Sequence, residues 1–115
     1  MNTHHYEIFD IVKTHLLKQG QRATVNNDED YRCSYHSPNG LKCAVGCLIT
    51  DEAYDSDIEG DDIGEATVKR ALRMSQIDTS AKTVLFLTRL QHVHDNLNVD
   101  EWPEALDKIE ERLLL

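Results

Sequence analysis

Apolar residues recur at helical spacing along most of the chain, and these intervals predict about five helices. The first helix is predicted over residues 3–19, where Ile8, Val12 and Leu16 lie one turn apart and Gly20 supplies a stop. Further helices are predicted over residues 63–76, from the Thr79–Ser80 cap to 96, and from 100 to 113. The pattern therefore predicts a mainly α fold.

The densest apolar run, residues 41–49, predicts one more helix over 41–54. In that helix Cys43 and Cys47 would share one stripe, although Gly46 costs up to about 1 kcal/mol in a helix interior. Gly46 also indicates a point where another part of the backbone passes closely. Residues 31–43, before the main part of this run, predict a short extended or hairpin segment with a turn at its Pro-Asn-Gly sequence.

The length of 115 residues is typical of a single domain, so residues 1–115 are expected to form one globular unit. No apolar run approaches the roughly 20 residues that cross a bilayer, and the N-terminal sequence lacks the features of a signal peptide. We therefore expect a cytoplasmic protein with no membrane partner. Three cysteines, an odd number, are then expected to be free thiols, buried residues or metal ligands.

The charge is strongly negative and unevenly distributed. The formal net charge is −9, which argues against a nucleic-acid partner because phosphate binding needs clustered Lys and Arg. Residues 51–65 contain eight acidic residues out of fifteen, and 43–68 contain no Lys or Arg. This segment is either a solvated acidic loop or a surface for a basic partner or a cation. The oligomeric state is left open by the sequence.

A thiol site is the first candidate for chemistry. Cys43 follows a turn, and His94 and Asp95 lie downstream in the order used by several cysteine hydrolases. Adjacent helical residues point about 100° apart, so Asp95 is not expected to orient the His94 ring, and Gln91, one turn earlier, is better placed. The alternative is that Cys43 is a small buried apolar residue.

A zinc site is the second candidate. Four soft ligands occur within fifteen residues, with the spacing Cys-x2-His-x6-Cys-x3-Cys. They are Cys33, His36, Cys43 and Cys47. The paired Cys-x2-Cys elements typical of structural zinc sites are missing, so this ligand set stays an alternative.

A calcium loop is the third candidate. Asp55, Asp57 and Glu59 fit the first positions of an EF-hand loop that begins at residue 55 and has Gly60 at its sixth position. The bidentate glutamate belongs at position twelve, where Ala66 stands, so the match fails there. We expect no resident cofactor apart from these zinc and calcium alternatives.

Trp102, the single tryptophan, is the fourth candidate. Beside Pro103 at a helix start it is either an anchor for a binding partner or a core residue, and a lone tryptophan in a domain of this size favours the core.

Several pieces of the sequence resemble a group of small phage and bacterial proteins. The pieces are Gly40-Leu-Lys-Cys43-Ala-Val-Gly46-x-Leu-Ile, Asp51-Glu-x-Tyr54, Glu59-Gly60, Phe86-Leu-x-x-Leu90-Gln91-x-x-His94-Asp95 and the Trp102 helix. They cover roughly residues 31–112. That group has no established activity, so the resemblance carries no catalytic role. It implies a phage or prophage origin, hence a host cytoplasm, and a turn at Glu59-Gly60 into the next helix.

Together these features predict a small acidic accessory protein without enzymatic activity that binds a protein or small-ligand partner. If the protein is phage-encoded, it would modulate a host process. One alternative is a thiol-dependent hydrolase or transferase that uses Cys43 with His94. A second alternative is a zinc-stabilised structural domain.

Overall fold

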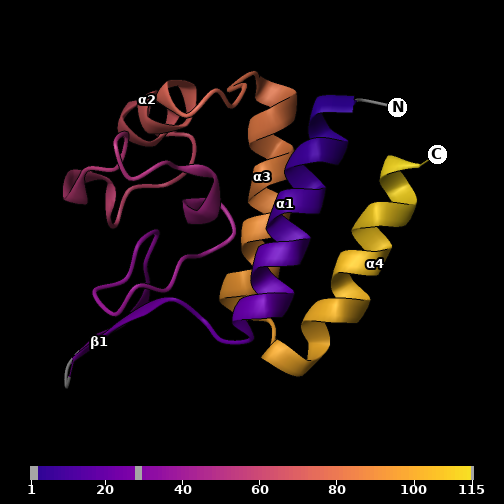
Figure 1. Ribbon diagram of the computed structural model, residues 1–115, viewed down its shortest axis with the longest axis horizontal. Helices are drawn as coiled ribbons and strands as arrows, with labels where there is room; N and C mark the ends of the chain where they lie inside the picture. Colours follow the sequence, from indigo (N-terminus) through magenta and orange to yellow (C-terminus); the bar gives the residue numbers. More distant parts are fainter. Residues whose placement is uncertain (1–2, 28–29, 115) are drawn as a thin grey trace.

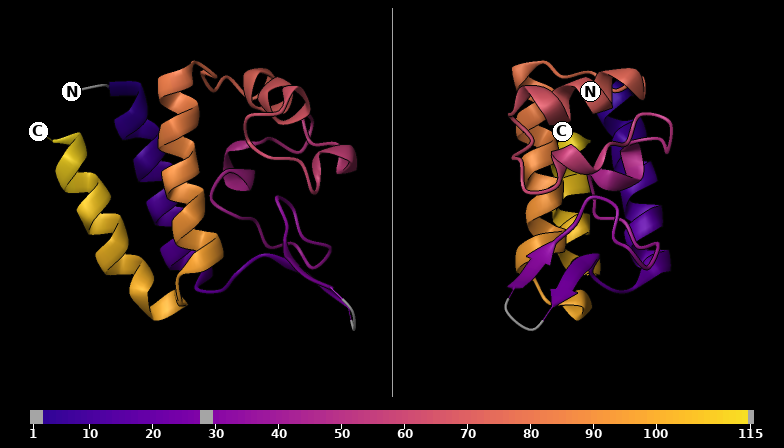
Figure 2. Two further views of the ribbon diagram at one scale, coloured as in Figure 1. Left: turned by 180° about the vertical axis from the view of Figure 1, so that it is seen from behind. Right: turned by 90° about the vertical axis from the view of Figure 1, so that its left-hand side faces the viewer.

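Three helices lie side by side in the computed structural model, which describes residues 3–27 and 30–114 (Figure 1). They are α1 (Thr3–Gln19), α3 (Ala81–Asn96) and α4 (Trp102–Leu113), and each contacts the other two. α1 and α3 run in the same direction and α4 runs antiparallel to them (Figure 1, Figure 2). The start of α1 and the end of α4 therefore lie at the same end of the bundle.

The other half of the molecule is mostly irregular and lies beside α1 and α3 (Figure 2). A hairpin pairs β1 (Thr24–Asn27) with β2 (Asp30–Cys33), and an isolated bridge between His36 and Lys42 follows it. The only α-helix described in this half is α2 (Ala66–Met74). Single 3₁₀ turns occur at Gly46–Leu48 and Ser56–Ile58, and a third, Val99–Glu101, leads into α4.

The helix predicted over 3–19 is confirmed as α1. Ile8, Val12 and Leu16 are fully buried, as their spacing predicts. Gly20 adopts a positive φ of 65° and donates its N–H to the carbonyl of Leu16 at 2.9 Å. A glycine in this conformation closes a helix without a Cβ penalty, which is why α1 ends here.

The two C-terminal helices are also confirmed. Ser80 is the N-cap residue of α3, which ends at Asn96 as predicted. Asn98 and Glu101 form a capping box before α4, and Pro103 lies in its first turn. The helix predicted over 63–76 is present but shorter than predicted: α2 begins at Ala66 and ends at Met74.

The helix predicted over 41–54 is wrong. Most side chains from 43 to 49 are buried, whereas an amphipathic helix would bury one face. Two backbone N–H groups near its start bond to side chains outside the segment: Lys42 donates to Gln19 and Val45 donates to Gln91, both at 2.9 Å. The hydrogen bonds within the segment form separate turns, such as the bond from Cys47 to the carbonyl of Cys43 at 3.0 Å. Side-chain contacts and isolated turns therefore take the place of a continuous helical ladder here.

The close approach predicted at Gly46 is confirmed. A Cβ built at this position would lie 1.9 Å from the carbonyl oxygen of Tyr35, far inside van der Waals contact. Only glycine fits between the two backbone segments. The mainly α fold is also confirmed, with four α-helices rather than five in the described residues, and so is an extended segment near 31–43. Its partner strand, Thr24–Asn27, was not predicted.

Across residues 3–27 and 30–114, none of the helices is both long enough and apolar enough to cross a membrane.

Candidate functional site

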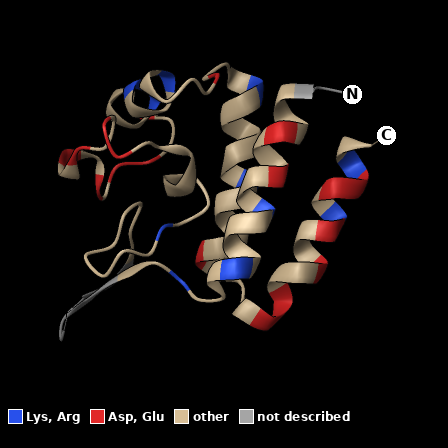
Figure 3. Cartoon of the chain, in the orientation of Figure 1, with Lys and Arg blue, Asp and Glu red and all other residues tan. Residues whose placement is uncertain are grey.

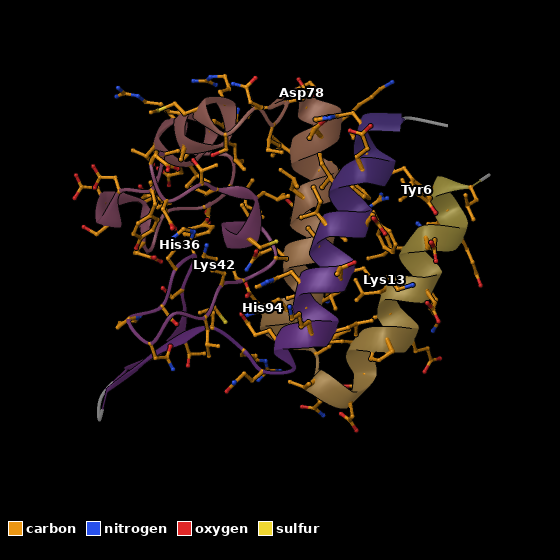
Figure 4. The ribbon with its side chains drawn as sticks, in the orientation of Figure 1. Tyr6, Lys13, His36, Lys42, Asp78 and His94 are labelled. Atoms are coloured by element: carbon orange, nitrogen blue, oxygen red, sulfur yellow. The ribbon has the colours of Figure 1, made fainter. Side chains whose placement is uncertain are left out.

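His94 is the centre of a buried polar network near the C-terminal end of α3 (Figure 4). Its Nδ1 lies 2.7 Å from Oδ1 of Asp95, and its Nε2 lies 3.0 Å from the backbone nitrogen of Ala23. A backbone amide can only donate, so Nε2 accepts and Nδ1 carries the proton that it donates to Asp95. The imidazole is therefore held in one neutral tautomer, with both nitrogens occupied.

The prediction that Asp95 would not orient the His94 ring is wrong. The Cα–Cβ directions of adjacent helical residues diverge, but the imidazole Nδ1 and the carboxylate oxygen each lie two bonds beyond Cβ and reach one another. Gln91 supports the carboxylate instead of the ring, because its Nε2 donates to Asp95 at 2.8 Å. Its Oε1 accepts the N–H of Val45 at 2.9 Å.

The Asp95 carboxylate is the acceptor that closes the network. Burial by itself raises its pKa, but hydrogen bonds from His94 and Cys33 outweigh burial and hold the pKa below its usual value. Burial, followed by the negative charge of Asp95, raises the pKa of the Cys33 thiol to about 12. Cys33 is therefore a protonated donor that fixes the end of β2 to α3.

Arg22 adds a second connection between the start of the hairpin and α3. Its guanidinium donates to the carbonyl oxygens of His94, at 3.1 Å, and of Leu97. These are carbonyls at the C-terminal end of the helix, where a positive charge is favourable. The network and Arg22 together attach the irregular half to the bundle.

Cys43 lacks the environment of a nucleophile. Its side chain is 1% exposed and accepts the N–H of Gly46 at 3.3 Å. Burial raises the pKa of its thiol far above the ordinary value, so the thiolate is not populated near neutrality. Within the described part of the chain it makes no hydrogen bond to His94, which has no free nitrogen to act as base. Cys43 is the small buried residue of the alternative interpretation.

The four predicted zinc ligands do not converge. Nε2 of His36 lies 2.8 Å from the carbonyl oxygen of Gly46, and the ring stacks on Tyr54 at 4.2 Å, in the loops away from His94 (Figure 4). Cys47 donates its thiol to the carbonyl of Ala44 at 3.0 Å. These side chains are used in local hydrogen bonds and do not share a centre.

Among the described residues, one group of three metal-ligand types is close together. Ligand atoms of Cys33, His94 and Asp95 lie within 4.8 Å of one another. A metal on Nδ1 of His94 would force Nε2 to carry a proton against the N–H of Ala23. The hydrogen bonds present therefore do not fit a metal at this cluster.

The predicted calcium ligands are also directed elsewhere. Asp55 accepts the N–H of Asp57 at 2.9 Å and caps the 3₁₀ turn at Ser56–Ile58. Glu59 points inward, where it accepts the backbone N–H groups of Tyr35 and His36 at 2.9 and 3.1 Å. The carboxylates thus stabilise loops, and Glu59 joins the 3₁₀ turn to the extended segment.

Trp102 is a core residue. Its side chain is 0% exposed and stacks near His94, with ring centroids 5.6 Å apart. It offers no surface to a partner, so the anchor role is wrong.

An open polar cleft lies beside this network. It has a volume of about 600 Å³ and is bounded by the end of β2, the 60–64 loop and one face of α3. Its lining includes Ser34, Asp61, Asp62, Gln91, His92 and Asp95. No Lys or Arg is among the described residues that line it, so its potential is negative.

Ser34 is the residue of this cleft that the sequence analysis missed. Its hydroxyl is buried, with 1% of the residue exposed, and has no hydrogen-bond partner among the described residues. Asp61 and Asp62 belong to the acidic segment that the sequence did reveal. A single serine after a strand gives no signal, because whether its hydroxyl is paired depends on the tertiary structure.

No protein-family model matches this chain, and comparisons with curated proteins and solved structures also find no match. The resemblance to small phage and bacterial proteins therefore stays a prediction.

Proposed function

We propose that this protein is a non-enzymatic binding domain whose acidic cleft takes a small organic cation, an amine or guanidinium compound. The observation that carries the proposal is the buried Ser34 hydroxyl, which has no partner among the described residues and lines a negatively charged cleft. An unpaired buried polar group destabilises a fold by about 1–3 kcal/mol, and a ligand that forms a hydrogen bond to it would remove that penalty.

The charges of the cleft select the ligand class. Asp61, Asp62 and Asp95 line it, and the hydrogen bonds that lower the pKa of Asp95 keep that carboxyl ionised near neutrality. An anion would be repelled, whereas an ammonium or guanidinium group gains charge-assisted hydrogen bonds. A volume of about 600 Å³ lies within the usual range for small-molecule sites.

The chemistry around the cleft supports binding without catalysis. Cys33 and Cys43 are protonated thiols, since burial raises both pKa values, and His94 has no free nitrogen. An activated nucleophile needs a base or a lowered pKa beside it. The polar groups that remain accessible in the cleft recognise a ligand rather than attack it.

Isothermal titration calorimetry with spermidine, L-argininamide and Mg²⁺ tests this function. At least one organic cation should bind with 1:1 stoichiometry, and Ser34→Ala and Asp62→Asn should each weaken it about tenfold, or about 1.4 kcal/mol. Asp57→Asn, an exposed acidic residue outside the cleft, is the matched control and should not change the affinity.

Three outcomes would overturn the proposal: no saturable heat with either organic cation, binding of Mg²⁺ alone, or equal losses in Asp57→Asn and Asp62→Asn. The last result would mean that net charge, rather than the cleft, attracts the cation.

A further inference from the structure

A second concave surface lies between α3 and α4. Its volume is about 650 Å³, and most of its lining residues come from α3 and α4. Figure 2 shows these two helices from behind. Its floor is apolar and comes from Phe86, Val93 and Leu97 on the α3 side and from Ala105, Ile109 and Leu113 on α4. Leu85 on the α3 side is 56% exposed. The groove thus leaves apolar surface in contact with water.

Basic residues line both sides of this groove. Lys82 and Arg89, seven residues apart, lie along α3, and Lys108 and Arg112, four apart, lie along α4. Both spacings place the members of a pair on the same face of their helix. None of the described residues that line the groove is acidic, although the net charge of the chain is −9. The basic positions on α3 and α4 are visible in Figure 3.

These cations are available to a partner. Among the described residues, Lys82, Arg89 and Arg112 take part in no ion pair, whereas other basic side chains do. Lys108 pairs with Glu104 at 3.6 Å, but both side chains are more than 70% exposed, so that pair is weak.

The groove also has the length of a short helix. From Lys82 to Leu97 it follows α3 for about 22 Å at 1.5 Å per residue, which corresponds to about four helical turns. An apolar floor between two rows of cations is complementary to a helix with an apolar stripe and acidic residues on both sides of that stripe. This is the helix-in-groove mode of recognition.

We infer that the groove between α3 and α4 binds an acidic amphipathic helix of a partner protein, with the apolar stripe on the floor and its carboxylates between the Lys and Arg rows. A second copy placed by a two-fold axis would bring two basic grooves together, and like charges oppose that arrangement. A flat anionic membrane would reach the rims and leave the floor uncovered. This inference is independent of the cation cleft.

Fluorescence anisotropy with a labelled 16-residue peptide tests the docking. The peptide carries leucines at i, i+3, i+4 and i+7 with glutamates on both sides of them, and a scrambled peptide of the same composition is the first control. The helical peptide should bind with a Kd in the micromolar range. The scrambled peptide should bind at least tenfold more weakly, and a tenfold rise in salt should weaken the specific binding.

The variant Arg89→Glu/Arg112→Glu should reduce the affinity for the peptide at least tenfold. Lys18→Glu/Arg70→Glu makes the same charge change at exposed helix positions outside the groove and should reduce it less than threefold. Leu85→Ser tests the apolar part, because this exposed side chain can change without loss of the fold. Circular dichroism of each variant confirms that it is folded.

Several results would overturn the inference. They are no peptide binding, equal binding of the scrambled peptide, or equal losses in both double variants. Binding to phosphatidylglycerol vesicles without binding to the peptide would assign the face to a membrane. A dimer in sedimentation equilibrium that Arg89→Glu/Arg112→Glu abolishes would assign it to a second copy.

Discussion

The two sides of α3 carry concave surfaces of similar size and opposite character. The cleft towards the hairpin encloses about 600 Å³ and is polar and acidic, whereas the groove towards α4 encloses about 650 Å³ and is apolar and basic. Thr88 and His92 line both. A net charge of −9 therefore does not predict the charge of each surface, because an acidic cleft and a basic groove lie on opposite sides of one helix.

The surfaces also differ in how they are held. The groove is built on regular helices with their own backbone ladders, so its shape depends on apolar packing. The cleft depends on side chains of α3 that bind the backbone and the thiol of distant segments, as Gln91 does with Val45. Damage to the irregular half should therefore destroy the cleft and leave the groove.

Among the substitutions in the half of the molecule that forms the cleft, Gly46→Ala should reduce the stability of the fold the most. The added Cβ meets the backbone of Tyr35, which cannot move away as a flexible side chain does, and we expect a loss of about 3 kcal/mol or more in the free energy of unfolding. Urea denaturation measures this loss. Gly64→Ala is the control, since a Cβ there meets nothing within 4 Å. Equal stability of the two variants would contradict the close approach.

Asp95→Asn should cause the second largest loss of stability, because it removes the carboxylate that accepts hydrogen bonds from His94 and Gln91. The carboxylate is about one-third exposed, which reduces the cost to about 2 kcal/mol at pH 7. The folded state lowers the pKa of this group, so its contribution is complete above the unfolded value of about 3.9. That contribution is lost as the pH falls through the lower pKa of the folded state.

Urea midpoints of the wild type and Asp95→Asn should therefore approach each other in strong acid. Asp10→Asn, an exposed residue of α1, should follow the wild type at every pH. If the urea midpoints of the wild type and Asp95→Asn still differ at pH 2, the stability of the network does not depend on the charge of the carboxylate.

Ser34→Ala should have the smallest effect on stability. Removal of an unpaired buried hydroxyl should change the free energy of unfolding by no more than about 0.5 kcal/mol, in the stabilising direction. The same variant should bind the organic cation more weakly, although its stability is unchanged or slightly higher. A clear destabilisation in urea would give Ser34 a structural role instead.

The sequence predicts the groove side of the molecule far better than the cleft side. α1, α3 and α4 bury residues at helical period and carry recognisable ends, such as Gly20 and Ser80, so local rules suffice. The segment from Cys43 to Ile49 is buried on nearly all sides, and an apolar run of that kind does not distinguish a helix from an irregular core segment.

The candidate site shows the same limit. His94, Asp95, Gln91 and Cys33 do meet, but as a closed network rather than as catalytic groups, because the N–H of Ala23 occupies the second nitrogen of the imidazole. That contact joins residues 71 positions apart and leaves no local signal. The basic rows of the groove follow from helical spacing once α3 and α4 are placed together.

The long separation of these partners also governs the order of assembly during translation. The hydrogen bonds from Ala23 to His94 and from Val45 to Gln91 join segments 71 and 46 residues apart, and loop closure must precede such contacts. The residues before Ala81 are therefore synthesised before the helix that anchors them exists. Until α3 has been synthesised, the apolar segment around Val45 lacks the partner that accepts its N–H.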